Sequence, residues 1–521
     1  MPRRPASPLW SSLALDRSAA ASLQDQIVGY FRDAVLSGRL KGGARVPSSR
    51  VLAADHDVAR ITVVEAYDRL VAEGFLTSRP GSGLFVAATE GEPKVRLVAG
   101  TSRRQRKRMP ELRRNDQVFL VPERPLGLLP LSPGVPALDR FPWRDWARIT
   151  ARLLRERPAH AMGYDDPRGD CGLRQAIAEY LGQARGIACT ADQVIVVAGS
   201  QQGIDLTARV VAAPGAEAWV EDPGYPAARA ALASAGLGIV PVPVGAEGLD
   251  AAKGAETAPR ARLVLVSPSH QYPLGATMSL RRRLALLDWA ERADAWILED
   301  DYDGEYRYGG RPLAPLHTLD RGNRVLYLGT FSKVLAPGLR LGYLVVPEAA
   351  IAHFAQLKAT TDRHAPGLDQ RIVARFLAEG RLAAHLRRMR VLYAGRRAAL
   401  VQALRREADD FLAVDDDAGA GLNLVARLKL RADDVAASRH ALERQVHAAA
   451  LSPYYVGRPR ERGFVLGFAG TPEDRIAPAV RILAAAIADQ RPPRSRGRVQ
   501  TVVRINGVQK ITNKSATHSS K

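Results

Sequence analysis

The spacing of apolar and polar positions divides the chain into two patterned regions. Between residues 16 and 88 apolar residues recur at helical spacing, beginning at Leu23, Ile27, Phe31, Val35 and Leu36. From residue 126 to 490, short runs rich in β-branched residues alternate with longer segments of helical period. We therefore expect a small, mainly α-helical domain followed by a larger α/β domain.

The larger region contains six short apolar runs: QVIVVAG, AWVEDP, RLVLVSP, AWILEDD, RVLYLGT and LGYLVVP. Strands separated by helix-length segments are typical of a mixed, mostly parallel sheet with helical crossovers. After about residue 395 the pattern changes to helices with isolated strands, GLNLVARL and GFVLGFAG. This change predicts a smaller α+β lobe.

The small region has three helical segments and a glycine-rich end. The third segment, ARITVVEAYDRLVAEGFL, can turn Val64, Tyr67, Leu70 and Val71 to the core and expose Arg60 and Thr62 near its start. In helix-turn-helix proteins those first residues reach base edges. The alternative is a small helical bundle that serves only for dimerisation.

A hairpin follows the third helix in TSRPGSGLFVA, where the glycines permit a tight turn. Arg79 at its tip could enter the minor groove or meet a phosphate. Three helices followed by such a wing predict a winged helix-turn-helix domain that binds an operator in double-stranded DNA.

Residues 22–87 resemble the winged helix-turn-helix domain of the GntR superfamily, through GRLKGGARVPSSRVLA and TVVEAYDRLVAEGFLTSRPGSGLFV. The resemblance implies DNA contacts by Arg50, Arg60, Thr62 and Arg79, and it implies that Gly81 lets the wing approach the duplex. Some members of the superfamily carry an arginine where this chain has Val64, so one contact is missing here.

The second candidate site is built around a lysine in LGTFSKVLAPGLRLGY. Pyridoxal 5'-phosphate (PLP) needs a lysine for a Schiff base, an acid at its pyridine nitrogen, an aromatic ring on its face and donors for its phosphate. Lys333, Asp300 and Tyr225 supply the first three, and Tyr302 can donate to the phenolate oxygen. The predicted phosphate-binding residues are Gly199, Ser200, Gln201, Thr330, Ser332 and Arg340.

Each of these features has an ordinary explanation when it is taken alone. A lone lysine is usually solvated, GSQQG is a weak helix-start signal, and EDDYD could be a solvated loop or a metal site. Their order along the chain and their places at strand ends favour one PLP site and no metal, because sites in open α/β sheets form at the carboxyl ends of strands.

Residues 126–490 resemble the fold-type I aminotransferases, and their combination with a GntR-like domain resembles the MocR family of transcription regulators. The strings that carry this likeness are YDDPRGDCGLR, GSQQGIDL, DPGYP, PSHQYPLG, LEDDYDGEYRY and GTFSKVLAPGLRLGY. The resemblance assigns the Schiff base to Lys333, the pyridine nitrogen to Asp300 and the stacking ring to Tyr225. It also implies that Tyr164 reaches the phosphate of a neighbouring subunit in a homodimer.

Two departures from the enzymes bear on catalysis. Tyr272 stands where the enzymes have the asparagine of NPTG, and Val465 stands where they usually have an arginine for the substrate carboxylate. Arg229, Arg458 or Arg460 could replace that arginine. We therefore expect weak transaminase turnover or none.

Charge and composition add a partner and a location. The 521 residues carry a net charge of +21, which favours a polyanionic partner, although a coding bias toward arginine is an alternative explanation. Residues 89–125 are predicted to be a basic linker and residues 491–521 a disordered basic tail. Two cysteines, no secretory signal and no 18-residue apolar run favour a cytoplasmic protein without a membrane span.

The sequence therefore predicts a PLP-dependent, DNA-binding transcription regulator that senses an amino compound, or PLP itself, through Lys333. The main alternative is a genuine aminotransferase that carries a DNA-binding domain. A further alternative is a constitutive DNA-binding protein in which the large domain is only a dimerisation scaffold.

Overall fold

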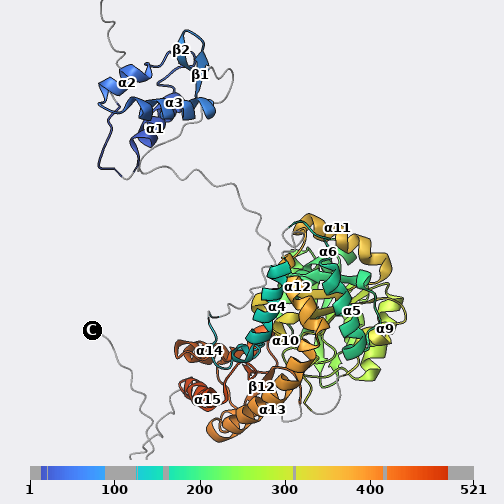
Figure 1. The fold of residues 1–521 in the computed structure, drawn as a ribbon. Helices are drawn as coiled ribbons and strands as arrows, with labels where there is room; N and C mark the ends of the chain where they lie inside the picture. The colour runs from blue at the N-terminus through green and yellow to red at the C-terminus, as the bar shows by residue number, and fades with distance from the viewer. Residues whose placement is uncertain are drawn as a thin grey trace, which may run out of the picture. The chain divides into compact units, whose positions relative to one another are not determined.

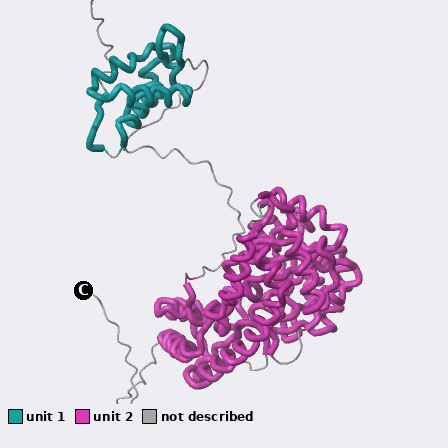
Figure 2. The backbone as a smooth tube through the Cα atoms, in the orientation of Figure 1, with its two compact units in different colours: residues 1–113 teal, residues 114–521 magenta. Residues whose placement is uncertain are grey.

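The computed structural model describes residues 13–19, 21–87, 125, 127–156, 163–308, 313–414 and 419–490. The chain divides into two compact units, residues 1–113 and 114–521 (Figure 2). We call them the small unit and the large unit. The predicted tail lies outside the described residues, as does the predicted linker apart from Pro125. The predicted domain boundaries therefore stay predictions.

The small unit has three helices and one hairpin. Its elements are α1 (Leu23–Leu36), α2 (Ser49–Asp55), α3 (Arg60–Ala72), β1 (Leu76–Arg79) and β2 (Gly83–Val86). The side chains of Ser22 and Ser48 accept hydrogen bonds from the backbone N–H groups of Asp25 and Val51, so both cap their helices. The strands pair antiparallel with Leu76 opposite Val86 and Arg79 opposite Gly83.

The core of the small unit differs by one position from the predicted helical face. In α3 the buried residues are Val63, Ala66, Tyr67 and Leu70, whereas Val64 is only partly buried. Three helices that cross in a small core bury a face wider than one stripe, so adjacent positions such as 63 and 64 compete for the interior.

The large unit is built on an eight-stranded sheet in the order β3-β10-β9-β8-β7-β4-β5-β6. Its strands are β3 (Val194–Val197), β4 (Glu217–Asp222), β5 (Gly238–Gly245), β6 (Gly248–Leu249), β7 (Leu263–Val266), β8 (Trp296–Asp300), β9 (Val325–Thr330) and β10 (Gly342–Val345). The neighbouring strands β9, β8, β7, β4 and β5 run parallel to one another, whereas β10 is antiparallel to both of its neighbours. All six predicted runs form strands, and the predicted mostly parallel sheet is confirmed.

Helices cover both faces of this sheet (Figure 1). In β7, Leu263 and Leu265 pack in one core cluster with α6, while Val264 and Val266 pack in another with α9. Burial on both faces explains why the strands read as continuous apolar runs. The helices of this lobe are α4 (Trp143–Glu156), α5 (Cys171–Arg185), α6 (Ser200–Val211), α7 (Pro226–Ser234), α8 (Ala251–Thr257), α9 (Leu280–Arg292), α10 (Phe331–Val334), α11 (Ile351–Thr361) and α12 (Gly367–Ala378).

The predicted smaller lobe is a four-stranded sheet in the order β11-β12-β14-β13 with three helices. Its elements are α13 (Arg381–Glu407), β11 (Leu412–Val414), β12 (Asn423–Leu428), α14 (Asp434–Glu443), β13 (Ala449–Ala450), β14 (Gly463–Gly467) and α15 (Glu473–Ala488). We call this part the small lobe of the large unit and the part on the eight-stranded sheet the large lobe. The helices α13, α14 and α15 lie together in Figure 1.

Candidate functional site

A cavity of about 460 Å³ opens at the carboxyl ends of the central strands of the large unit. Glu221, Asp300 and Thr330, from the ends of β4, β8 and β9, line it. Because β10 runs antiparallel to β9, the turn that leads into β10 lies at the same edge of the sheet. The predicted residues that line the cavity are Ser200, Gln201, Tyr225, Asp300, Tyr302, Thr330, Ser332, Lys333 and Arg340.

One end of the cavity is formed by the start of α6. Gly199 caps this helix with a φ of 88°, and a Cβ on it would lie 3.2 Å from a terminal nitrogen of Arg340. The Arg340 guanidinium donates to the carbonyl of Ala198 at 2.8 Å. A helix start with free N–H groups, next to an arginine, suits a phosphate. Gly199 itself does not line the cavity. Its positive φ sets the path of the chain into α6.

Lys333 lies in the first turn after β9, on the short helix α10. Its side chain is partly buried, and its Nζ donates to the carbonyl of Gly134 at 2.7 Å. A Cβ at Gly134 would lie 2.8 Å from that Nζ, so the glycine makes room for the lysine tip.

Asp300 is buried in the same cavity. Burial raises the pKa of its carboxyl to about 7, repulsion from Asp301 and Asp303 adds to this, and the charge of Lys333 opposes it. Its Oδ1 is buried and has no hydrogen-bond partner among the described residues. A buried carboxyl with an open acceptor is what a protonated pyridine nitrogen requires, so the residues present fit PLP.

Three tyrosines, Tyr225, Tyr272 and Tyr302, line the cavity. The ring centroids of Tyr225 and Tyr272 lie 6.0 Å apart at an interplanar angle of 87°. Tyr302 is buried, and its hydroxyl lies 3.0 Å from Nδ1 of His270, which in turn contacts Asp303 at 3.1 Å. The chain of contacts holds the Tyr302 hydroxyl in one place.

Glu221 is a cavity residue that the sequence did not single out. Its side chain is buried, and burial raises its pKa to about 8. Its Oε2 accepts from Nε2 of Gln271 at 3.3 Å, and Oε1 has no hydrogen-bond partner among the described residues. The acidic pair Glu221-Asp222 at the end of an apolar run was the available signal, but only the pleat decides which of the two faces the cavity.

Of the three arginines considered as carboxylate anchors, only Arg229 lines the cavity. It lies on α7 and is buried, and burial lowers the pKa of its guanidinium. Arg458 and Arg460 are exposed and do not line the cavity. Val465 is fully buried in β14 within an apolar cluster.

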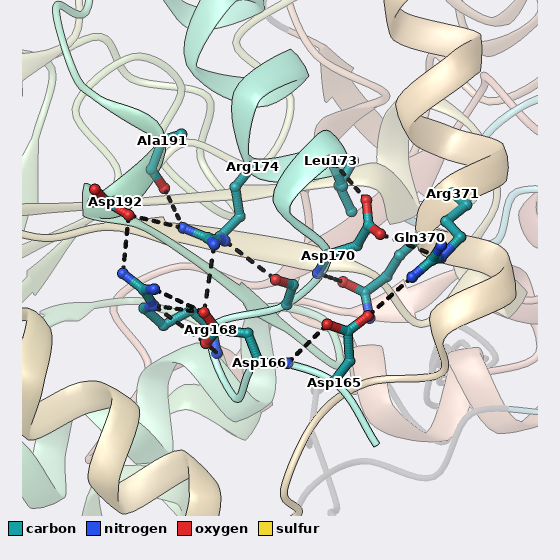
Figure 3. A network of polar contacts seen from close by, with 11 residues as sticks. Asp165, Asp166, Arg168, Asp170, Leu173, Arg174, Ala191, Asp192, Gln370 and Arg371 are labelled. Atoms are coloured by element: carbon teal, nitrogen blue, oxygen red, sulfur yellow. Dashed lines mark hydrogen bonds and ion pairs between the residues drawn. The ribbon is translucent and has the colours of Figure 1, made fainter. Parts of the chain in front are cut away.

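Tyr164 lies away from the cavity, with 83% of its surface exposed. The segment that follows it is held by the polar network of Figure 3, in which Arg168 pairs with Asp166 at 2.7 Å and Arg371 pairs with Asp165 at 3.1 Å. The guanidinium of Arg363 covers the tyrosine ring at 4.5 Å from its centroid. The network holds the residues after Tyr164, whereas the tyrosine itself is exposed. Its predicted role at the phosphate of a neighbouring subunit stays a prediction.

The predicted DNA-binding residues lie on α2, α3 and the hairpin. Arg50 is exposed on α2, and Arg60 is the exposed first residue of α3, whereas Thr62 is partly buried. Gly81 forms the hairpin turn with a φ of 71°. The Arg79 guanidinium lies 4.6 Å from the ring centroid of Phe85 on the opposite strand.

A further arginine, Arg45, was not predicted to bind DNA. It lines a hollow of about 280 Å³ between the helices and the hairpin, together with Ser48 and Ser49. A Cβ at Gly83 would lie 3.5 Å from its guanidinium. The sequence pattern gave no sign that Arg45 lies beside the wing, because the contact joins segments almost forty residues apart.

Both units match families of known proteins. Residues 23–86 match the model of bacterial regulatory proteins of the gntR family, and residues 128–483 match that of class I and II aminotransferases. The probable rhizopine catabolism regulatory protein MocR of Rhizobium meliloti is 39% identical over 479 residues, which cover 91% of this chain and 95% of that protein. This chain belongs to the MocR family of transcription regulators.

Other members of the MocR family and solved enzymes agree with this. The HTH-type pyridoxine biosynthesis transcriptional regulator PdxR of Corynebacterium glutamicum is 33% identical, with 92% of this chain and 98% of that protein covered. Among solved structures, the LysN α-aminoadipate aminotransferase of Thermus thermophilus is 31% identical with a TM-score of 0.64, over 70% of this chain and 92% of that one. The kynurenine aminotransferase of Pyrococcus horikoshii is 28% identical with a TM-score of 0.64, over 70% and 91%.

The family, the fold and the PLP cofactor predicted from the sequence are thereby confirmed, and the protein is a PLP-binding, DNA-binding transcription regulator. Within the described residues, no helix is both long and apolar enough to cross a membrane. The roles of individual residues remain predictions.

Proposed function

We propose that this regulator reads its operator with α3 and the hairpin of the small unit and responds to a small primary amine in the cavity of the large unit. The observation that carries the proposal is the shared cavity of Lys333 and Asp300, with an amine and an open carboxyl oxygen in one enclosure. Asp300 ends β8 and Lys333 follows β9, so the fold brings the two groups together from different strands.

The lining residues divide among the parts of PLP. Lys333 would hold its aldehyde, Asp300 its pyridine nitrogen, Tyr225 its ring face and Tyr302 its phenolate oxygen. The start of α6 with Ser200 and Gln201, together with Thr330, Ser332 and Arg340, would hold its phosphate. When it is bound, PLP supplies an aldehyde that exchanges one primary amine for another.

This exchange supports a sensing role for Lys333. An amine that takes the place of Lys333 leaves its Nζ without a covalent partner, and the carbonyl of Gly134 at 2.7 Å is ready to accept from it. Lys333 thus has two states that an effector can bias, and a ligand that favours one of them shifts the balance. The effector would be an amino compound that takes the place of Lys333, or PLP itself.

A homodimer is part of the proposal because exposed Tyr164 could complete the site of a second subunit only across an interface. The domain limits 16–88 and 126–490 and a cytoplasmic location, where the chromosome lies, are also part of it. The second candidate function is a genuine aminotransferase, which the combination of Lys333, Asp300 and Tyr225 in one cavity favours. We place it second because Val465 leaves an apolar patch where the enzymes have their arginine.

A DNA titration at fixed salt, with and without an amine, tests the proposal. We expect the wild type to be yellow and to change its operator affinity with the effector by roughly 5- to 150-fold, the usual range of coupling. Lys333→Ala should lose the absorbance band and the amine response but keep its operator binding. Keto-acid formation over many turnovers would favour the enzyme instead, and an amine response that survives in Lys333→Ala would contradict the sensing role of Lys333.

A further inference from the structure

A buried arginine in the cavity wall joins the two lobes of the large unit. Arg229, on α7 of the large lobe, donates to the carbonyls of Pro453 at 3.2 Å and Tyr454, which belong to a turn of the small lobe. It also donates to the carbonyl of Gly224 at 3.1 Å. Only 4% of Arg229 is exposed. Its position therefore links the ligand cavity to the contact between the lobes.

The turn at residues 452–456 is fixed to the small lobe on its other side. Ser452 donates from its backbone N–H to Asp434 at 2.9 Å. Other hydrogen bonds join this turn to the large lobe besides those of Arg229. Val456 donates to Asp222 at 2.8 Å, Gly224 donates to the carbonyl of Tyr454 at 3.1 Å, and the hydroxyls of Tyr272 and Tyr454 lie 2.9 Å apart. Release of Arg229 would remove two hydrogen bonds between this turn and the large lobe.

Arg229 carries a buried positive charge that is hydrogen-bonded only to neutral groups among the described residues. All of its partners are neutral carbonyls, its Nε is buried without a hydrogen-bond partner among the described residues, and no carboxylate of those residues lies within ion-pair distance of it. The charge of Asp222 attracts the Arg229 guanidinium without forming an ion pair with it, and burial still lowers the pKa of the guanidinium. An arginine binds a carboxylate through two parallel bonds that are stronger than bonds to neutral carbonyls. A carboxylate that enters the cavity would therefore compete well for this guanidinium.

We propose that Arg229 is a latch between the lobes, and that the acidic group of an effector with both an amine and a carboxylate draws it from the carbonyls of Pro453 and Tyr454. The inference rests on the proposed function, since the amine of the same effector reacts at Lys333. Binding at the two ends of one ligand then loosens the turn at residues 452–456 and lets the lobes shift. The latch supplies what the amine exchange alone lacks, which is a contact that differs between two arrangements of the lobes.

The test uses the full chain loaded with PLP and straight-chain ω-amino acids from glycine to 5-aminopentanoate, each paired with its neutral primary amide. The change in cofactor absorbance measures binding. At the length that spans the cavity we expect the acid to bind roughly 10- to 100-fold more tightly than its amide, as for a hydrogen bond to a charged group. Hydrogen exchange at the amides of Gly224 and Val456 should be faster with that acid and unchanged with the amide.

Three variants separate the latch from simple packing. Arg229→Gln should bring acid and amide affinities within about threefold of each other, and should show fast exchange at Gly224 and Val456 without any ligand. Arg229→Lys keeps the charge and should retain part of the preference, which guards against a folding defect in the glutamine variant. Arg458→Gln is the matched control, because this arginine is exposed two residues beyond the turn and outside the cavity.

The outcomes also separate the two proposals. Acids and amides that shift the absorbance equally at every length, or a preference for the acid that survives in Arg229→Gln, overturn the latch and leave the sensing role of Lys333 intact. Unchanged exchange at Gly224 and Val456 in the presence of the preferred acid overturns the latch as well. A wild type whose absorbance no acid or amide changes overturns both.

Discussion

The small unit exposes its candidate DNA-binding arginines, whereas the large unit buries two carboxyls of its cavity. In the small unit, Arg50, Arg60 and Arg79 are exposed on the helices and the hairpin that the fold predicts will meet DNA. In the large unit, Asp300 and Glu221 are buried in the cavity wall, and burial raises the pKa of each. The candidate DNA-binding arginines are exposed to solvent, and these two carboxyls of the cavity are not.

The difference teaches how each unit gains affinity. Exposed arginines act through contacts with phosphates and base edges, which salt weakens. Burial destabilises the charged form of a carboxyl until a ligand supplies a counter-charge or a donor. Salt screens such buried interactions only weakly. The contacts that these buried carboxyls make with the cofactor should therefore depend little on salt, while operator affinity should fall steeply with it.

The largest expected effect is on the buried side of this comparison. Asp300→Asn keeps the size of the side chain but removes the charge that pairs with the pyridine nitrogen. We expect PLP affinity to fall by about 1.5–3 kcal/mol, as for a charge-assisted bond, with little change in operator affinity. A PLP titration by absorbance measures the loss, and Asp288→Asn on the exposed face of α9 is the matched control. Equal PLP affinity in both variants would remove Asp300 from the site.

On the exposed side, Arg60→Ala should weaken operator binding by about 1–3 kcal/mol if Arg60 makes a bidentate base contact. The effect should be specific to the operator and should disappear with unrelated DNA. Fluorescence anisotropy with both DNAs at fixed salt measures it. Arg292→Ala, an exposed arginine of the large unit paired with Asp288, controls for the change in net charge. Equal losses on both DNAs would mean that Arg60 reads no base.

Arg79 sharpens the comparison because it should act through phosphate. Arg79→Ala should weaken all sequences similarly and reduce the slope of log affinity against log salt by about 1. Titrations at several salt concentrations measure this slope. A loss confined to the operator would instead mean that the hairpin reads bases in the minor groove.

Glu221 gives a pH signature to the buried side. Burial raises its pKa from 4.5 to about 8, so the folded, cofactor-free protein keeps a proton that the unfolded chain releases. The resulting stability is complete below pH 4.5 and is lost as the pH rises toward 8. In Glu221→Gln the free energy of unfolding should fall less steeply over this range, by up to about 1.4 kcal/mol per pH unit. Denaturant unfolding at several pH values tests this, with the exposed Glu217→Gln on the same strand as control.

The smallest effect is expected from the end of the chain. Truncation after residue 490 should leave the absorbance of bound PLP and the stability of the large unit unchanged, because the predicted tail adds no apolar surface to a core. Absorbance and thermal unfolding measure this. A bleached or unfolded truncation product would show that the tail belongs to the large unit.

Much of the cavity could be anticipated because its residues stand at recognisable strand ends. Ser200, Tyr225, Asp300 and Lys333 each follow an apolar run, and in a parallel sheet such ends meet at one edge. The strand β5 was missed because Pro241 and Pro243 interrupt its pattern, and prolines argue against a strand. It tolerates them next to the short edge strand β6, where few ladder bonds are needed.

The sequence by itself determined the two kinds of domain, the family and the cofactor, because periodicity and short motifs are local properties of the chain. Only the tertiary structure decided which residues share the cavity and what they contact there. Arg229 looked like a carboxylate anchor in the sequence, yet in the fold it braces a turn more than 220 residues away. The acidic pair Glu221-Asp222 stood out in the sequence, but only the pleat of β4 decided that Glu221 lines the cavity. Contacts between distant segments depend on how strands and lobes pack, and that packing minimises the free energy of the whole unit rather than of any one segment.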